Sequence, residues 1–177
     1  MRFITILTAI FYSCSNNPES VKEFITKEHL PIEKIEEATM LHTENGLLKV
    51  KITASTIKRF QEIQPEVVFS NGVEVIFYND SGLVNSVLKA ENAEINESNK
   101  LMTASNNVIL TSSDGKELQT EELIWDERKN KIYTEKKVVI TTEKEVIHGE
   151  GFKSNADFSE YSISKIYGTF NFNTTTE

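Results

Sequence analysis

The sequence contains few of the side chains that carry out chemistry. Its one cysteine, Cys14, has no second thiol with which to form a disulfide bond. The three histidines, His29, His42 and His148, are too widely separated to pair as metal ligands on one helix face. Motifs of the G-x-S-x-G, H-E-x-x-H, G-x-x-x-x-G-K and C-x-x-C types are absent. These absences indicate a protein that is not an enzyme and that uses no metal or cofactor.

Carboxylates are numerous, but their spacing does not suit acid–base catalysis. Glu121 and Glu122 are adjacent, and neighbours in a strand point to opposite faces, so the two cannot share a proton. A glycan-cleaving enzyme would need two carboxylates facing each other across a cleft at about 5–10 Å. Sequence spacing does not reveal such an arrangement, so this class stays an alternative.

Positive charge is also scarce. There are 19 Lys and Arg against 27 Asp and Glu, which gives a net charge of −8 and excludes a nucleic-acid surface. A groove that holds an anionic ligand would need local compensation. Four lysines are candidates for the mouth of such a groove: Lys49, Lys51, Lys153 and Lys165.

No hydrophobic run is long enough to span a bilayer. Met1 and Arg2 precede an apolar run of about ten residues, which predicts a signal peptide over residues 1–13. Cys14 stands where cleavage would occur, as in a bacterial lipobox, and we expect it to be lipidated. A free thiol or an uncleaved anchor are the alternatives. Residues 14–40 are expected to form a lipidated N-terminus and linker, with a helical turn or two within residues 21–37.

From Leu48 onward the apolar residues alternate with polar ones, which is typical of half-buried strands. Asn71-Gly72 predicts a hairpin turn because both residues tolerate a positive φ. Polar reversals at residues 96–100, 114–115, 127–131 and 143–145 separate the later strands. Short strands without intervening helices predict antiparallel neighbours.

Residues 90–101 resemble residues 120–132, and a third copy follows Gly149 and Gly151. One such unit of about thirty residues cannot bury its apolar face alone, so successive units must stack. The two glycines predict a bulge or a close backbone approach. We therefore expect an all-β domain over residues 41–177, a twisted, open antiparallel β-jelly roll or sandwich.

Large apolar residues at alternate strand positions predict the inner face of this domain. Either they fill an ordinary core, or they line an apolar groove for acyl chains, each buried CH₂ contributing about 0.8 kcal/mol. The opposite phase, which includes Ile76 and Ile124, is also partly apolar. The groove candidates are Phe69, Val75, Phe77, Ile95, Leu110, Trp125, Ile140 and Phe152.

In order and spacing, several segments resemble the LptC family, and within it the lipoprotein form of Bacteroidetes-type bacteria. They are Phe69–Tyr78, Leu118–Asp126, Thr134–Val138, Gly149–Phe152 and Asp157–Ile163. The resemblance implies a periplasmic β-jelly roll that is anchored to the inner membrane, here through Cys14. It also implies that the protein accepts lipopolysaccharide from the subunits of an inner-membrane ABC transporter and passes it to an LptA-like bridge protein.

The last strand, Ile166–Phe172, is expected to be the edge that meets the bridge protein. Its partner-facing candidates are Ile166, Gly168, Phe170 and Phe172. A structural lipoprotein with a filled core, which binds another protein and carries no lipid, is the alternative function.

Overall fold

The structure is a computed structural model that describes residues 30–156 and 158–167. The chain divides into two compact units, residues 1–30 and 31–177, and every described strand belongs to the second. The strands are β1 (Glu33–Glu44), β2 (Leu47–Arg59), β3 (Val67–Tyr78), β4 (Val84–Ala90), β5 (Asn92–Asn96), β6 (Leu101–Ser112), β7 (Glu117–Asp126), β8 (Lys131–Thr141), β9 (Val146–Asn155) and β10 (Tyr161–Tyr167).

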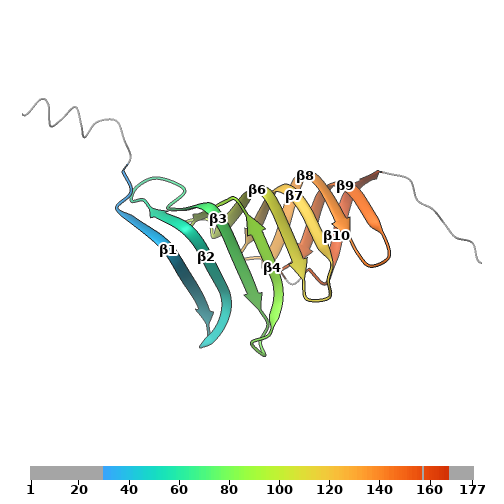
Figure 1. Ribbon diagram of the computed structural model, residues 1–177, viewed down its shortest axis with the longest axis horizontal. Helices are drawn as coiled ribbons and strands as arrows, with labels where there is room; N and C mark the ends of the chain where they lie inside the picture. Colours follow the sequence, from blue (N-terminus) through green and yellow to red (C-terminus); the bar gives the residue numbers. More distant parts are fainter. Residues whose placement is uncertain (1–29, 157, 168–177) are drawn as a thin grey trace, which may run out of the picture. The chain divides into compact units, whose positions relative to one another are not determined.

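All ten strands join one antiparallel sheet in the order β1-β2-β3-β4-β6-β7-β8-β9-β10 (Figure 1). β5 continues the row of β4 and pairs with the same two neighbours, β3 and β6. β1 and β10 each have one partner and are the two edges of the sheet. The expected all-β, antiparallel and open architecture is confirmed, and none of the described residues is helical.

A row of bulges crosses the sheet near the middle of its long strands. In β3, Asn71 and Gly72 have φ values of 65° and 96°, and in β6 Asn106 and Asn107 have values of 65° and 51°. Glu91, between β4 and β5, joins them: Gly72 N donates to Glu91 O at 2.9 Å, and Glu91 N donates to Asn106 O at 3.0 Å. Since bulges bend and twist strands, this row is where the sheet turns back on itself.

The row continues through the remaining strands as register shifts. β7 shifts against β8 between Thr120 and Ile124, and β8 shifts against β9 between Thr134 and Lys137. Two buried hydroxyls stabilise the bent backbone. Thr120 Oγ1 donates to Lys137 O at 2.9 Å, and Thr134 Oγ1 accepts from Lys136 N at 3.1 Å. We call this row the crease.

Asn71 and Gly72 correct one sequence prediction. They do not form a hairpin turn, because β3 runs unbroken from Val67 to Tyr78. Their tolerance of positive φ was predicted correctly. A β-bulge requires this property as a hairpin turn does. The hydrogen bond between Gly72 and Glu91 identifies the feature as a bulge rather than a hairpin turn.

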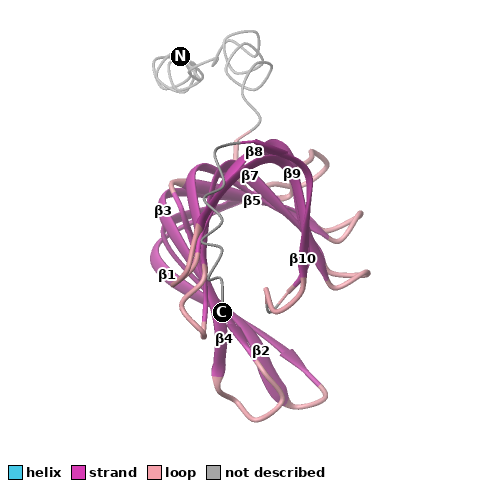
Figure 2. Cartoon of the chain, turned by 90° about the vertical axis from the view of Figure 1, so that its right-hand side faces the viewer, coloured by secondary structure: helices cyan, strands magenta, loops and turns pink. Residues whose placement is uncertain are grey.

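The crease divides the sheet into two layers that face each other (Figure 2). Three contacts join segments that are not neighbours in the sheet and so show that the layers meet. Phe77 and Trp125 have ring centroids 5.4 Å apart, Ser86 Oγ donates to Ala156 O at 3.1 Å, and His42 Nε2 lies 4.0 Å from Glu127 Oε1. The core lies between the layers and includes Phe69, Leu110 and Ile132, all fully buried.

The sheet begins at Glu33, inside the stretch that the sequence assigned to a linker. Residues 33–37, where a helical turn was expected, therefore belong to strand β1. β1 escaped recognition because it is an exposed edge strand, with only Ala38 and Met40 packed against the core. The expected signal peptide and Cys14 lie outside the described residues.

Gly149 has one of the two expected roles, and Gly151 has both. A Cβ on Gly149 would lie 2.3 Å from the Ile163 side chain and 2.9 Å from Lys165 O, so the close approach of β10 requires glycine. Gly151 lies on the crease with a φ of 75°, and its Cβ position is 2.9 Å from Ser164 Oγ.

Replacing Gly72 by Ala should reduce the free energy of unfolding by about 1–3 kcal/mol, because a Cβ is strained at this backbone conformation. No atom lies within 4 Å of the position that the new Cβ would take, so the effect isolates the backbone. The measurement is the urea midpoint of the full chain. Asn71→Gly is the matched control: it accepts the same positive φ, loses the 3.4 Å hydrogen bond from Asn71 Nδ2 to Thr56 Oγ1, and should cost less than about 1 kcal/mol. Equal stability of Gly72→Ala and wild type would show that the crease does not require glycine.

Candidate functional site

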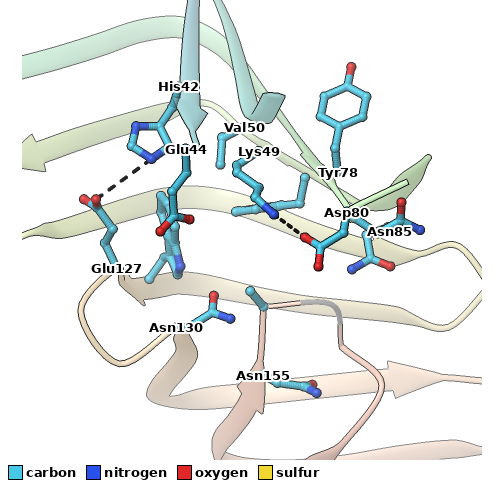
Figure 3. Close-up of a pocket in the computed structure, with 14 residues that line it drawn as sticks. His42, Glu44, Lys49, Val50, Tyr78, Asp80, Asn85, Glu127, Asn130 and Asn155 are labelled. Atoms are coloured by element: carbon cyan, nitrogen blue, oxygen red, sulfur yellow. Dashed lines mark hydrogen bonds and ion pairs between the residues drawn. The ribbon is translucent and has the colours of Figure 1, made fainter. Parts of the chain in front are cut away.

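A pocket of about 700 Å³ opens on the side of the sheet opposite the crease, between the edges of the two layers (Figure 3). One wall comes from the ends of β1 to β4 nearest their connecting turns. The other comes from the β7–β8 turn and the start of the β9–β10 loop. We call this pocket the mouth. It is the place where the space between the layers meets solvent.

Hairpin turns hold the polar side chains of the mouth in place. Asn79 Oδ1 accepts from Ser81 N at 2.9 Å and from Leu83 N at 3.0 Å, which fixes the turn that carries Asp80. On the opposite wall, Asp126 Oδ1 accepts from Lys129 N at 3.1 Å. A further bond from Lys129 Nζ holds the pKa of the Asp126 carboxyl below its usual value. This turn presents Glu127 and Asn130.

Five acidic or basic side chains line the mouth: His42, Glu44, Lys49, Asp80 and Glu127. Lys49 Nζ donates to Asp80 Oδ1, and this bond holds the pKa of Asp80 below its ordinary value. Glu127 has His42 at 4.0 Å, across the gap between the layers. Among the described residues, Glu44 has no ion-pair partner. Figure 3 shows Lys49 directed toward Asp80 and His42 toward Glu127.

Four asparagines complete the polar rim: Asn79, Asn85, Asn130 and Asn155. Within the described part of the chain, the side-chain amides of Asn85 and Asn130 make no hydrogen bond. An amide offers both donors and acceptors to a ligand. The rim can therefore bind uncharged hydroxyl groups as well as charged groups.

The floor of the mouth is an aromatic pair. Phe77 from β3 and Trp125 from β7 meet edge to face, at an interplanar angle of 84°. The same two rings line a small apolar cavity of about 10 Å³ behind the mouth, together with Val75, Leu88 and Ile132. Trp125 Nε1 is buried without a hydrogen-bond partner. The pair thus separates a polar, wet compartment from a dry, apolar one.

The structure places all eight groove candidates on the inner face, so the chosen phase is the inward one. Phe69, Val75, Phe77, Leu110, Ile140 and Phe152 are buried, and Ile95 and Trp125 pack partly buried against the core. Only Phe77 and Trp125 reach the mouth, and the other six pack between the layers. Their role in lipid binding stays a prediction.

The lysines expected at the mouth are mostly elsewhere. Lys49 lines it but is bound to Asp80, whereas Lys165 is bound to Glu150 at 2.9 Å on β9. Lys153 lines a separate shallow pocket. Of the partner-edge candidates, Ile166 lies on the edge strand β10 with 54% of its surface exposed. Gly168, Phe170 and Phe172 lie outside the described residues.

Sequence reasoning missed one core residue and the polar rim of the mouth. Phe158, fully buried against Phe152 and Tyr161, lies in the β9–β10 loop, where no alternation marks a core residue. The rim was missed because its members come from separate turns. The only signal in the sequence that Phe158 could be buried was its own large aromatic side chain.

A family model described as "Lipopolysaccharide-assembly, LptC-related" matches residues 3–165. The chain belongs to the LptC family. Members of this family take part in lipopolysaccharide transport, and they are periplasmic proteins associated with the inner membrane. No curated protein matches the chain significantly.

Among residues 30–156 and 158–167, no helix has the length and hydrophobicity needed to cross a membrane. The same residues contain no cluster of three or more side chains able to hold a metal ion. Members of the LptC family are transport components. The mouth has polar groups above an aromatic floor and apolar side chains behind it, an arrangement that suits binding of an amphiphile.

A double-mutant cycle should measure how strongly the aromatic floor joins the layers. We expect Phe77→Leu and Trp125→Leu to show a coupling of about 0.5–1.5 kcal/mol, the usual worth of an edge-to-face ring pair. The free energies of unfolding of the two single variants and the double variant give this coupling. Phe69→Leu with Trp125→Leu is the control pair, because no ring contact joins these residues. Zero coupling between Phe77 and Trp125 would mean that the layers do not meet at the mouth in solution.

Proposed function

We propose that the protein accepts lipopolysaccharide from an inner-membrane ABC transporter and passes it to an LptA-like bridge protein. The acyl chains enter between the layers while the sugar headgroup stays in the mouth. The observation that carries this proposal is the aromatic pair Phe77–Trp125, which stands between a polar pocket and an apolar interior. An amphiphile is the class of ligand that needs both compartments.

The interior has little free space, so acyl chains enter only when the layers separate. The three contacts across the open side are a ring pair, one hydrogen bond and the approach of His42 to Glu127 at 4.0 Å. Together they contribute about 1–4 kcal/mol. Burial of ten CH₂ groups contributes about 8 kcal/mol. The lipid can therefore offset the loss of these three contacts, and its acyl chains replace the contacts that the inward side chains lose as the layers part, with the crease as the hinge.

Transport of this kind requires no chemistry from the chain itself. The transporter hydrolyses ATP, and the chain supplies an apolar path whose cargo is held by burial. The acyl groups on Cys14 would hold the protein at the inner membrane, since two or three chains anchor firmly where one does not.

β10 supports the transfer step because it is an unpaired edge. A strand at the edge of a sheet offers free N–H and C=O groups to a partner strand. Ile166 and Tyr167 are exposed on it, at 54% and 46% of their surfaces. The bridge protein would extend the sheet there, through Ile166, Gly168, Phe170 and Phe172, and so continue the path between the layers.

A scaffold function has one observation in its favour. The cavity behind the aromatic floor holds only about 10 Å³, as in an ordinary filled core. A lipoprotein that binds another protein and carries no lipid would have such an interior permanently.

A photo-crosslinking amino acid at Phe77 should form a lipopolysaccharide adduct in cells, and only while the transporter hydrolyses ATP. The same amino acid at Glu74 is the control, because Glu74 lies on the outer face of β3 and faces Lys89 at 3.5 Å. Adducts are detected by immunoblotting for the lipid. A folded Phe77 variant that captures its protein partners but never the lipid would favour the scaffold function.

Deletion of residues 166–172 should abolish capture of the bridge protein, because it removes the exposed end of the edge strand. Binding to the transporter should persist. Co-purification from membranes measures both. A chain that lacks only residues 173–177 is the control and should behave as the wild type does. Normal capture by the deletion variant would move the partner edge to β1.

A further inference from the structure

The rim of the mouth has the wrong charge for a phosphorylated headgroup. Three carboxylates and one ammonium give it a net charge of −2 when His42 is neutral. Lys49, the one ammonium, is already bound to Asp80. Phosphate groups entering the mouth would therefore meet Glu44 and Glu127 with no free cation among the residues that line it.

The two cations of the β7–β8 turn next to Glu127 are bound to other groups. Arg128, beside Glu127 in the sequence, donates from Nε to Asn99 O at 3.1 Å and from Nη2 to Ser98 O at 3.3 Å. Lys129 donates to Asp126 at 2.7 Å. Glu44 has no ion-pair partner within the described residues, and Glu127 has only His42 at 4.0 Å. Two carboxylates thus remain available to a ligand, one on each wall of the mouth.

The uncharged part of the rim suits a sugar. The amides of Asn85 and Asn130 have no hydrogen-bond partner among the described residues, and each can both donate to and accept from a hydroxyl group. Asn130 lies on the same turn as Glu127, and Asn85 lies at the beginning of β4 close to the turn that carries Asp80. Sugar hydroxyls can therefore bind next to carboxylates on either wall.

We infer that the mouth selects an acylated sugar whose phosphates carry a substituent with an ammonium group, such as ethanolamine. Glu44 and Glu127 are the specificity-determining residues. This inference rests on the proposed function and names the form of its cargo. The ammonium groups would pair with the two available carboxylates, the hydroxyls with Asn85 and Asn130, and the acyl chains would pass below the aromatic floor. A headgroup with bare phosphates would be repelled by the same carboxylates.

Trp125 is the chain's one tryptophan and forms the floor of the mouth, so its fluorescence reports occupancy directly. The full chain would be titrated with diphosphoryl lipid A and with lipid A whose phosphates carry ethanolamine. We expect the ethanolamine-bearing form to bind about tenfold more tightly, a difference of about 1.4 kcal/mol. In the double variant Glu44→Gln with Glu127→Gln, the two affinities should agree within about twofold.

The control variant is Glu143→Gln with Glu145→Gln, which removes the same charge in the β8–β9 turn, away from the mouth. It should keep the tenfold preference, and circular dichroism should show that both double variants are folded. Equal binding of the two lipids by the wild type, or a preference that survives removal of Glu44 and Glu127, would overturn the inference and leave lipid transport standing. Unchanged Trp125 fluorescence with every lipid would overturn the proposed function, and the inference with it.

Discussion

The structure depends on one backbone constraint, the line of bulges at which a single sheet folds over. A flat antiparallel sheet with one apolar face needs a second layer to cover that face. Here the sheet covers itself, because Asn71, Gly72, Asn106 and Asn107 adopt positive φ and turn their strands together. The hydrogen bonds from Gly72 to Glu91 and from Glu91 to Asn106 keep these bends in line. The two layers are therefore halves of the same strands.

This origin of the layers decides where the molecule is closed and where it is open. Covalent strands join the layers at the crease, so that side cannot part. On the opposite side the layers end in turns, and only side-chain and loop contacts join them, such as Phe77 with Trp125 and Ser86 with Ala156. The polar mouth lies on that side because turns there supply Asp80, Glu127 and Asn130.

The alternation of buried and exposed residues could be predicted from the sequence, but the position of the crease could not. Val73, Val75 and Phe77 alternate with half-buried residues, so their inward direction could be predicted from a period of two. Asn71-Gly72 could not be resolved, because the same φ preference serves a hairpin and a bulge. The edge strand β1 was missed since few of its residues are buried. The mouth depends on which turns meet across the layers, and that is a property of the folded sheet rather than of any one segment.

The proposed transfer requires that the chain does not bind lipopolysaccharide too tightly, and the filled interior meets this requirement. If the layers enclosed an empty groove, an acyl chain would gain the full free energy of leaving water. In the closed sheet, inward side chains such as Val75, Leu88 and Ile132 already bury much of their surface against one another. A lipid that enters replaces these contacts with contacts of similar kind, so the net gain is smaller than the area that it buries suggests. In the proposed transfer, the same packing that resembles an ordinary core would let the chain release its cargo as readily as it accepts it.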